Sequence, residues 1–287
     1  MKYSLFTLSL PECTPAEAAA LIKKAGYDGV EWRCAEQPDE LSPIPNPWSS
    51  NRTTLDVRKW RKAVVEHRKI TQDHGLEFSN LASYCRADHL DSVKVAIEIA
   101  KELGCPRLRI CVPPYDRNIP YHELFARTRK CYEQCEALCR EAGVQGLLEL
   151  HMGNLAPSAS AALRLLDGLD PKHMGAMYDP GNMVIEGYEN WQMGCEILGK
   201  YLVYCHAKNM RYQLAEKTPH NGSKFQAEAC EMNAGLVDWS EVFNAFRRVG
   251  YDGWISNEDY FVPQWSSPLD RIRLGLEHLK RCATPVS

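Results

Sequence analysis

Four residues of metal-binding types stand at the ends of short apolar runs in this chain: Glu149, Asp179, His206 and Glu258. Each follows a segment where a parallel strand would deliver its last side chain into an active-site mouth. Three carboxylates and one imidazole suit a hard divalent cation, and buried acids would be costly without such a charge. A single strand-end glutamate could simply cap a loop, but four such residues in successive strands are hard to obtain by accident. The pattern therefore predicts one shared metal site.

The elements that must position these residues form a repeating pattern. Short strand-like runs alternate with amphipathic helical stretches, and we expect strands at residues 3–6, 29–32, 77–81, 108–112, 147–150, 175–178, 202–205 and 254–257. Eight strands separated by helices favour a closed parallel barrel over an open sheet. The length of 287 residues suits one such barrel, which typically needs about 250 residues. The sequence thus predicts an α/β fold, a single (β/α)8 TIM-barrel domain over residues 1–287.

Two connections are unusually long, at about residues 34–56 and 209–234. Both follow the carboxyl end of a predicted strand, which is the side where barrel enzymes bind their substrates. Long loops in compact domains are often lids or binding loops. Peripheral decoration or a contact between subunits is the alternative for both segments.

Composition narrows the class of protein. The net charge is −3 and no long basic run occurs, which disfavours nucleic-acid binding. No apolar run approaches the ~20 residues of a membrane span, and Pro11 follows Met1 too closely for a secretory apolar region. The twelve cysteines are scattered without a Cys-x-x-Cys pair, which favours reduced thiols. We therefore expect a cytoplasmic protein that does not associate with membranes.

Five segments carry a resemblance to a known family: Glu149–His151, Tyr178–Asn182, His206–Asn209, Gly235–Trp239 and Gly250–Glu258. They resemble the sugar phosphate isomerase/epimerase family, the xylose-isomerase-like TIM-barrel group. This group includes ketose 3-epimerases, inosose dehydratase, dehydroshikimate dehydratase and endonuclease IV. The resemblance covers nearly the whole chain. Its motifs specify the fold and the metal site well and the substrate poorly.

The resemblance implies that Glu149, Asp179, His206 and Glu258 bind one divalent metal ion, with Mn²⁺ favoured over Mg²⁺, Co²⁺ or Zn²⁺. Such an ion has open positions for the adjacent carbonyl and hydroxyl oxygens of a substrate. It would polarise the carbonyl and stabilise the enediolate that forms when a neighbouring C–H loses its proton. The resemblance assigns the catalytic proton transfer to Glu149 and Glu258. The leading hypothesis is therefore a metal-dependent isomerase or epimerase that acts on a small-molecule carbohydrate, a sugar or keto-sugar.

Further side chains are predicted to bind substrate at the mouth: Glu31, Arg33, His151, Asn182, Lys208, Arg211 and Trp265. His151 lies two residues beyond Glu149, and Lys208 two beyond His206, so strand alternation places each on the face of its neighbour. Trp265 would stack on a sugar ring. The alternatives are a structural histidine, a solvated lysine, charge pairing for Glu31 and Arg33, a surface role for Arg211 and aromatic packing for Trp265.

One departure from the family pattern affects the mechanism. Many members carry a histidine three residues after the aspartate that follows the sixth strand. In this chain that aspartate is Asp179, and the later position holds Asn182. A neutral amide binds substrate but cannot exchange protons near neutral pH. This keeps open a lyase or dehydratase, with Lys208 as the acid that protonates the leaving group. It also argues against a three-metal nuclease, which needs additional histidines.

Two further alternatives concern activity and assembly. A non-catalytic sugar-binding subunit on the same barrel would bind ligand without turnover and without a metal requirement. A site that no longer binds metal or catalyses a reaction has no physical reason to keep buried carboxylates, whose burial is energetically unfavourable. This argues against the alternative. The family resemblance makes a homo-oligomer plausible, although no interface motif is visible in the sequence.

Overall fold

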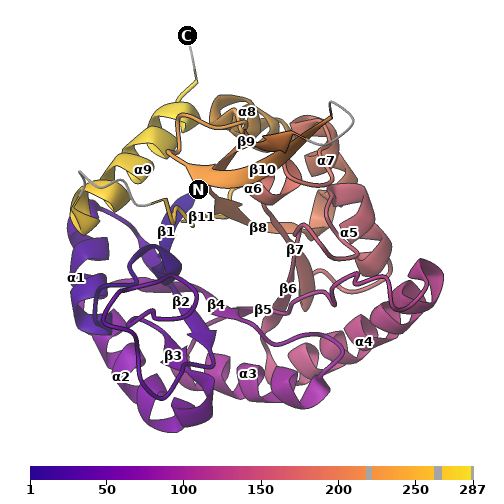
Figure 1. The fold of residues 1–287 in the computed structure, drawn as a ribbon. Helices are drawn as coiled ribbons and strands as arrows, with labels where there is room; N and C mark the ends of the chain where they lie inside the picture. The colour runs from indigo at the N-terminus through magenta and orange to yellow at the C-terminus, as the bar shows by residue number, and fades with distance from the viewer. Residues whose placement is uncertain (218–221, 262–266, 286–287) are drawn as a thin grey trace.

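Eight parallel strands close into a barrel in the computed structural model, which describes residues 1–217, 222–261 and 267–285 (Figure 1). The barrel strands are β1 (Lys2–Phe6), β2 (Gly29–Ala35), β4 (Glu77–Ser83), β5 (Arg107–Arg109), β6 (Gln145–Glu149), β7 (Met174–Tyr178), β8 (Leu202–Ala207) and β11 (Trp254–Asn257). Each pairs in parallel with the next, and β1 closes the ring by pairing with both β2 and β11. The predicted fold class is confirmed. Each strand overlaps its expected position, and β5 is shorter than expected.

Helices surround the barrel on its outer side (Figure 1). They are α1 (Pro15–Ala25), α2 (Trp60–Asp73), α3 (Leu90–Leu103), α4 (Tyr121–Ala142), α5 (Ala159–Leu166), α7 (Trp191–Leu198), α8 (Trp239–Val249) and α9 (Pro268–Ala283). The start of α1 shows why the chain becomes helical there, because Thr14 and Glu17 form a capping box and Pro15 occupies the first turn. Gly26 ends this helix with a left-handed φ of 92°.

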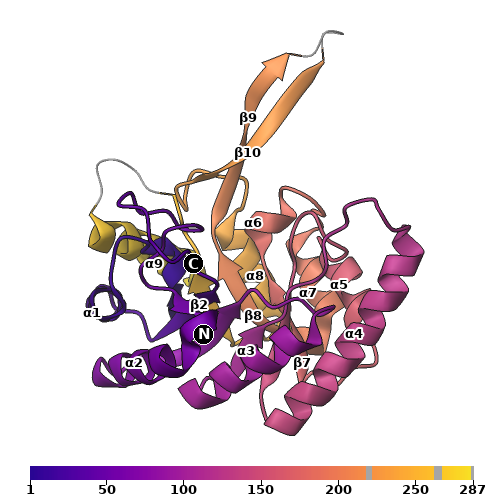
Figure 2. The same ribbon diagram turned by 60° about the horizontal axis from the view of Figure 1, so that its bottom comes forward.

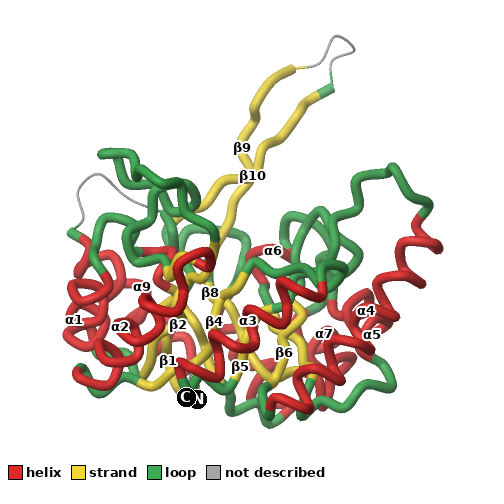
Figure 3. The backbone as a smooth tube through the Cα atoms, turned by 90° about the horizontal axis from the view of Figure 1, so that it is seen from below, coloured by secondary structure: helices red, strands yellow, loops and turns green. Residues whose placement is uncertain are grey.

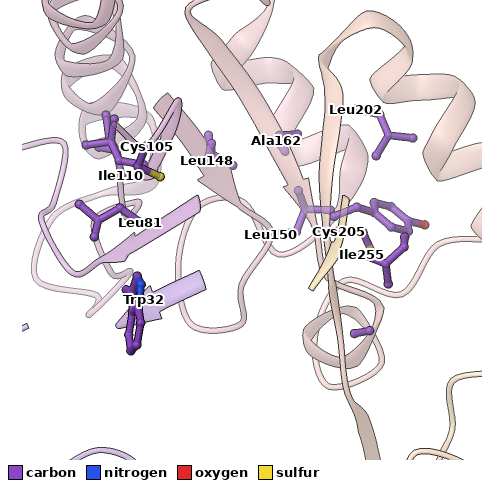
Figure 4. Close-up of a cluster of buried hydrophobic side chains, with 14 of the residues drawn as sticks. Trp32, Leu81, Cys105, Ile110, Leu148, Leu150, Ala162, Leu202, Cys205 and Ile255 are labelled. Atoms are coloured by element: carbon purple, nitrogen blue, oxygen red, sulfur yellow. The ribbon is translucent and has the colours of Figure 1, made fainter. Parts of the chain in front are cut away.

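Strand alternation separates the core from the site. Figure 4 shows apolar side chains of the strands, such as Leu148 and Leu150 of the β6 region, in the buried hydrophobic cluster that includes Ala162 of α5. Because successive side chains of a strand point to opposite faces, Glu149 between these two leucines faces the barrel interior. The same alternation places His206 inward between Cys205 and Ala207, which belong to the outer hydrophobic cluster.

The segment at about 209–234 differs from the expected loop. It contains an antiparallel hairpin of β9 (Asn209–Lys217) and β10 (Ser223–Cys230), which stands away from the barrel in Figures 2 and 3. Tyr212 pairs with Ala227, and Leu214 pairs with Phe225, so one face of the hairpin is apolar. The period-two alternation of these residues with polar neighbours is the signal for a strand that the sequence-based interpretation overlooked.

The other long connection, at about 34–56, remains irregular except for the two-residue strand β3 (Leu55–Asp56), which pairs with β2. Short helical turns complete the description: α6 (Pro180–Met183) at the mouth, and the 3₁₀ turns η1 (Thr7–Ser9), η2 (Val57–Lys59) and η3 (Gly199–Tyr201). None of the helices in the described ranges is long and apolar enough to cross a membrane.

Candidate metal centre at the barrel mouth

The four predicted ligands lie together at the carboxyl ends of four barrel strands. Glu149 ends β6, Asp179 follows β7, His206 belongs to β8, and Glu258 follows β11. Each contributes one donor atom to a group whose members lie within 4.8 Å of one another, and all four residues are buried. Side chains separated by as much as 109 positions in the sequence are therefore brought to one point by the closure of the barrel.

The imidazole of His206 sits at the centre of this group. Its Nδ1 lies 3.0 Å from Glu149 Oε1, 3.3 Å from Glu258 Oε2 and 3.9 Å from Asp179 Oδ2. The ring of Phe6 stacks on the imidazole with 5.5 Å between the centroids and 20° between the planes. Stacking on Phe6 thus helps to hold in position the imidazole nitrogen that faces the three carboxylates.

Glu31 fixes the other side of the same imidazole. His206 Nε2 lies 3.0 and 3.1 Å from the two carboxylate oxygens of Glu31. Asn80 Nδ2 and Tyr204 Oη donate hydrogen bonds of 2.8 and 2.9 Å to the same carboxylate. An Nε2–H donated to Glu31 directs Nδ1 toward the ligand group, which is a common arrangement around metal-binding histidines. The carboxylate of Glu31, which the sequence predicts to bind substrate, is surrounded by these protein donors.

Lys208 lies against two of the ligand carboxylates. Its Nζ is 2.5 Å from Asp179 Oδ2 and 2.6 Å from Glu258 Oε2, and the side chain is buried. The neighbouring turn α6 makes room for it, because a Cβ added at Gly181 would lie 2.5 Å from Lys208 Cγ. The predicted shared face of Lys208 and His206 agrees with this position.

Asn182 orients Asp179 rather than projecting into open space. Its backbone N–H donates to Asp179 Oδ1 at 2.9 Å, and its side-chain Nδ2 donates to Asp179 Oδ2 at 2.8 Å. The same Nδ2 lies 3.1 Å from the carbonyl oxygen of Leu150. Asn182 therefore anchors Asp179, a candidate ligand, to the turn α6.

Arg109 is a site residue that the sequence-based prediction missed. Its Nη1 donates to Glu149 Oε2 at 2.8 Å, and its Nε donates to the carbonyl of Ser83 at 3.0 Å. Leu108 and Ile110 on either side belong to the outer hydrophobic cluster, so Arg109 points inward. The sequence signal that could have identified Arg109 is a charged residue between two apolar strand residues, at a position that faces the barrel interior.

The charges around Glu149 and Glu258 keep both carboxylates ionised. Burial acts to raise the pKa of Glu149, but Arg109 and His206 outweigh it and hold that pKa well below its usual range. Burial also opposes the ionisation of Glu258, whereas Lys208 and His206 lower its pKa to about 2. Both groups are therefore in the form that binds a cation or accepts a proton.

Asp179 and the two nearby cations behave differently. Burial raises the pKa of Asp179 to about 6 in spite of the attraction of Lys208. Burial acts to lower the pKa of both cations, yet the surrounding carboxylates prevail. Glu31 and Glu258 raise the pKa of His206 well above its usual value, and Asp179 and Glu258 raise that of Lys208 well above its own. The protein thus places protonated groups among carboxylates that would otherwise repel one another.

The donor set fits one divalent cation. Three carboxylates and an imidazole nitrogen converge in a buried space, and the described residues add no thiolate to the group. Oxygen-rich sets with one imidazole suit Mg²⁺, Mn²⁺ and similar ions rather than soft metals. A buried cluster of this acidity is stable only with compensating positive charge.

Comparison with known proteins identifies the family. The sequence matches the xylose isomerase-like TIM barrel family over residues 19–282. The chain belongs to this family. An inosose dehydratase of Bacillus licheniformis is 23% identical over 233 residues, which cover 78% of this chain and 74% of that protein. The rhizopine catabolism protein MocC of Rhizobium meliloti is 23% identical over 287 aligned positions, with 94% and 82% covered. An inosose dehydratase of Bacillus velezensis matches over only 48% of each chain, at 27% identity.

Solved structures of sugar epimerases share the fold. The D-allulose 3-epimerase of Methylomonas sp. superposes with a TM-score of 0.72 at 16% identity, and 98% of each chain is covered. The 3-keto-D-glucoside 4-epimerase of E. coli gives 0.71 at 15% identity, with 98% of this chain and all of the other covered. At these identities the likeness shows the barrel architecture.

The remaining predicted residues of this family member are spread over the mouth and beyond it. Arg33 is buried and tied to the 34–56 connection, donating to Thr54 Oγ1 at 2.7 Å and to the Trp48 carbonyl at 2.8 Å. His151 lines a cavity of about 310 Å³ beside Glu149. Arg211 is not brought to the cluster, because it lies exposed on the hairpin and pairs with Glu228 at 2.6 Å. Trp265 lies outside the described residues.

Proposed function

We propose that this protein is a divalent-metal-dependent isomerase or epimerase that moves a proton next to the carbonyl of a sugar or keto-sugar. One observation carries the proposal: two ionised carboxylates, Glu149 and Glu258, lie within 3.0 and 3.3 Å of His206 Nδ1 in the buried ligand group. The names of the similar proteins, D-allulose 3-epimerase, 3-keto-D-glucoside 4-epimerase and inosose dehydratase, support a carbohydrate substrate.

The proton transfer is assigned to the two glutamates. Glu149 enters from β6 and Glu258 from the end of β11, so their side chains approach the mouth from strands separated by β7 and β8. One carboxylate accepts the proton from the carbon beside the carbonyl, and the other, after it has taken a proton from solvent, returns that proton to the carbon from its own side. When bound, a divalent ion supplies a Lewis acid that lowers the cost of the negative charge formed on the substrate.

The cavity beside Glu149 has room for such a substrate. Its volume is about 310 Å³, and Tyr84, Arg109 and His151 contribute to its walls. This volume is at the lower end of the range for small-molecule sites, which suits a ligand the size of a monosaccharide. The polar side chains in its wall, Tyr84, Arg109 and His151, supply donors for hydroxyl and carbonyl oxygens.

Lys208 supports a second candidate function, a lyase or dehydratase of a keto-sugar or keto-cyclitol. Its ammonium group lies 2.6 Å from Glu258 Oε2 inside the same ligand group, where it can donate a proton to an oxygen that leaves the substrate. The similarity to inosose dehydratases favours the same chemistry. The first step, loss of a proton beside the carbonyl, is common to both candidates.

Product analysis in heavy water tests the proposal. Mn²⁺-loaded protein is incubated in D₂O with ketoses, inososes and 3-keto-glucosides, and products are analysed by mass spectrometry. We expect an isomer that has gained deuterium, whereas a product that has lost water would identify the dehydratase. Ligand binding without exchange or turnover would contradict both candidates and favour a non-catalytic sugar-binding subunit.

Variants assign the chemistry to the two carboxylates. We expect Glu149→Gln and Glu258→Gln each to lower turnover by about 10²–10⁴-fold, the range for loss of a general acid or base. The bound metal is measured in parallel, because both residues are also candidate ligands. Glu133→Gln, an exposed carboxylate on α4, serves as the control. Retained turnover in either site variant would exclude the assignment.

A further inference from the structure

The hairpin of β9 and β10 leaves large apolar side chains open to solvent. It stands away from the barrel in Figures 2 and 3, and residues 211–217 of β9 and 223–226 of β10 are all exposed. Leu214 is 52% exposed, and Phe225, directly opposite in the register, is 62% exposed. A two-stranded hairpin on its own is at best marginally stable in water and needs packing against another surface. This hairpin therefore indicates a face that another molecule covers.

One hydrogen bond shows which way the apolar face of the hairpin is turned. Tyr212 shares this face with Leu214, because side chains two positions apart on a strand point to the same side. Tyr212 Oη donates to the carbonyl oxygen of Ile185 at 2.8 Å, in the connection between α6 and α7. The polar face lies on the other side, where Gln213 Nε2 donates to Glu228 Oε2 at 2.5 Å. The apolar face is therefore turned toward the connection between α6 and α7.

A pocket of about 460 Å³ lies at the foot of this apolar face. Its wall includes Val184 and Tyr188 of the same connection, together with Leu236. The backbone N–H of Leu236 donates to the carbonyl oxygen of Met210, at the base of β9, at 2.8 Å. The apolar surface thus continues from the hairpin onto the barrel. We call it the arm face, and its large exposed side chains are Tyr188, Tyr212, Leu214, Phe225 and Leu236.

The two ends of the arm face differ in charge. Asp238 and Glu241 line the pocket at its foot. At the far end of the hairpin, Lys217 and Lys224 are exposed beside one carboxylate, Glu216, which forms an ion pair with Lys224. Among the described residues the foot is therefore acidic and the far end carries a net positive charge. Such a surface complements itself under a two-fold rotation, because each far end then meets the foot of the other copy.

We propose that the arm face binds a second copy of this chain in a two-fold symmetric dimer. Leu214 and Phe225 of the two copies pack together near the axis, and the far end of each hairpin lies over the acidic pocket of the other copy. This arrangement covers both hairpins at once and supplies the packing that a lone hairpin lacks. None of the four candidate metal ligands takes part, so the dimer is independent of the chemistry at the metal centre.

The mass of the whole protein in solution tests the dimer. Light scattering and sedimentation equilibrium over a concentration series should give twice the mass of one chain. The double variant Leu214→Ser/Phe225→Ser should raise the dissociation constant of the dimer by about 30-fold or more, because central apolar residues supply most of the affinity of an interface. Val65→Ser, an exposed apolar residue of α2 on the other side of the barrel, is the control (Figure 1).

Exchange of charges tests the contact between the far end and the foot. Lys224→Glu and Glu241→Lys each place like charges together in a homodimer, so each variant alone should dimerise several-fold more weakly than the wild type. In a mixture of the two variants, a heterodimer brings opposite charges together at both contacts. We therefore expect the mixed pair to associate more tightly than either variant alone.

A single introduced cysteine locates the two-fold axis. Leu214→Cys should form a disulfide-linked dimer under mild oxidation, because residue 214 of each copy lies near the axis. Gln213→Cys, on the polar face of the same strand, should remain unlinked. The wild-type chain, treated in the same way, measures the background from its own twelve cysteines.

A monomer at every concentration measured would overturn the proposal and leave the arm face to a different partner. A dimer with unchanged affinity in Leu214→Ser/Phe225→Ser would also overturn it, since another surface would then hold the copies together. Equal cross-linking of the two cysteine variants would reject the arrangement around the axis. A mixed pair no tighter than the separate charge variants would reject the contact between the far end and the foot.

Discussion

The residue that decides how His206 faces the ligand group is Glu31. It lies 175 positions away in the sequence and contacts only the far nitrogen of the imidazole. Outer partners of this kind set the tautomer and orientation of a metal-binding histidine. We expect Glu31→Gln to weaken Mn²⁺ binding by about 10–100-fold, because the amide no longer holds the Nε2 proton with a full negative charge.

Titration calorimetry with Mn²⁺ measures this effect. Glu77→Gln, which changes an exposed carboxylate paired with Lys2, provides a control for the general loss of negative charge. An unchanged Mn²⁺ affinity in Glu31→Gln would show that Glu31 does not act through His206.

We expect protons to compete with a metal ion at this candidate site. The pKa of His206 lies well above its usual value and that of Asp179 is about 6, so both groups bind protons more readily in the metal-free protein. A metal needs the unprotonated forms, and therefore its affinity must fall as the pH falls. We expect a decrease of about tenfold per pH unit near pH 7 from the His206 proton.

Below about pH 6 the Asp179 proton adds to the competition, so the decrease becomes steeper. Calorimetry of Mn²⁺ binding between about pH 8 and 5, repeated in buffers of different ionisation enthalpy, counts the released protons. A pH-independent affinity over this interval would contradict the charge arrangement described for the cluster.

The sequence predicts the four ligands because each ends a recognisable apolar run, but it does not reveal their partners. Glu31 and Arg109 are inward-facing residues of β2 and β5 whose contacts depend on barrel closure. Asn182 could be located from its place after Asp179, whereas its anchoring bond to Leu150 joins two strand ends. Such contacts need the register of the whole sheet.

At the scale of elements, the turn α6 packs closely against Lys208, the residue that follows strand β8, and this contact is made at Gly181. The side chain of Lys208 passes over Gly181, where a Cβ would come within 2.5 Å of Lys208 Cγ. We expect Gly181→Ala to displace Lys208 from Asp179 and Glu258 and to lower turnover by about tenfold or more, with a small effect on folding.

A double-mutant cycle checks this explanation. In a Lys208→Ala background the clash disappears, so Gly181→Ala should cause no further loss of turnover. Additive losses in the double variant would mean that Gly181 serves another purpose, such as the backbone conformation of α6.

The hairpin shows what sequence-based reasoning about elements can miss. The mixture of polar and apolar residues in its segment predicts a loop, yet Tyr212 and Leu214 alternate with polar residues as in a strand with one apolar face. The prolines of the 34–56 connection predict an irregular segment, because neither a helix interior nor a central strand tolerates several closely spaced prolines.

At the scale of the whole molecule, the barrel is the means by which distant carboxylates meet. The strands β6, β7, β8 and β11 are neighbours in the sheet, so their carboxyl ends deliver the four ligands side by side. Alternation along each strand sends apolar side chains to the outer core and polar ones to the mouth. These two regularities explain why the fold and the convergence of the four residues could be predicted together, while the substrate could not.

The central claim is that Glu149, Asp179, His206 and Glu258 bind one divalent cation. Mn²⁺ titration of the chelator-treated protein, with the bound metal counted by mass spectrometry, tests it most directly. We predict one Mn²⁺ per wild-type chain and loss of this binding in both Asp179→Asn and His206→Gln. Absence of stoichiometric binding by the wild-type protein, or unchanged binding in these two variants, would contradict the account.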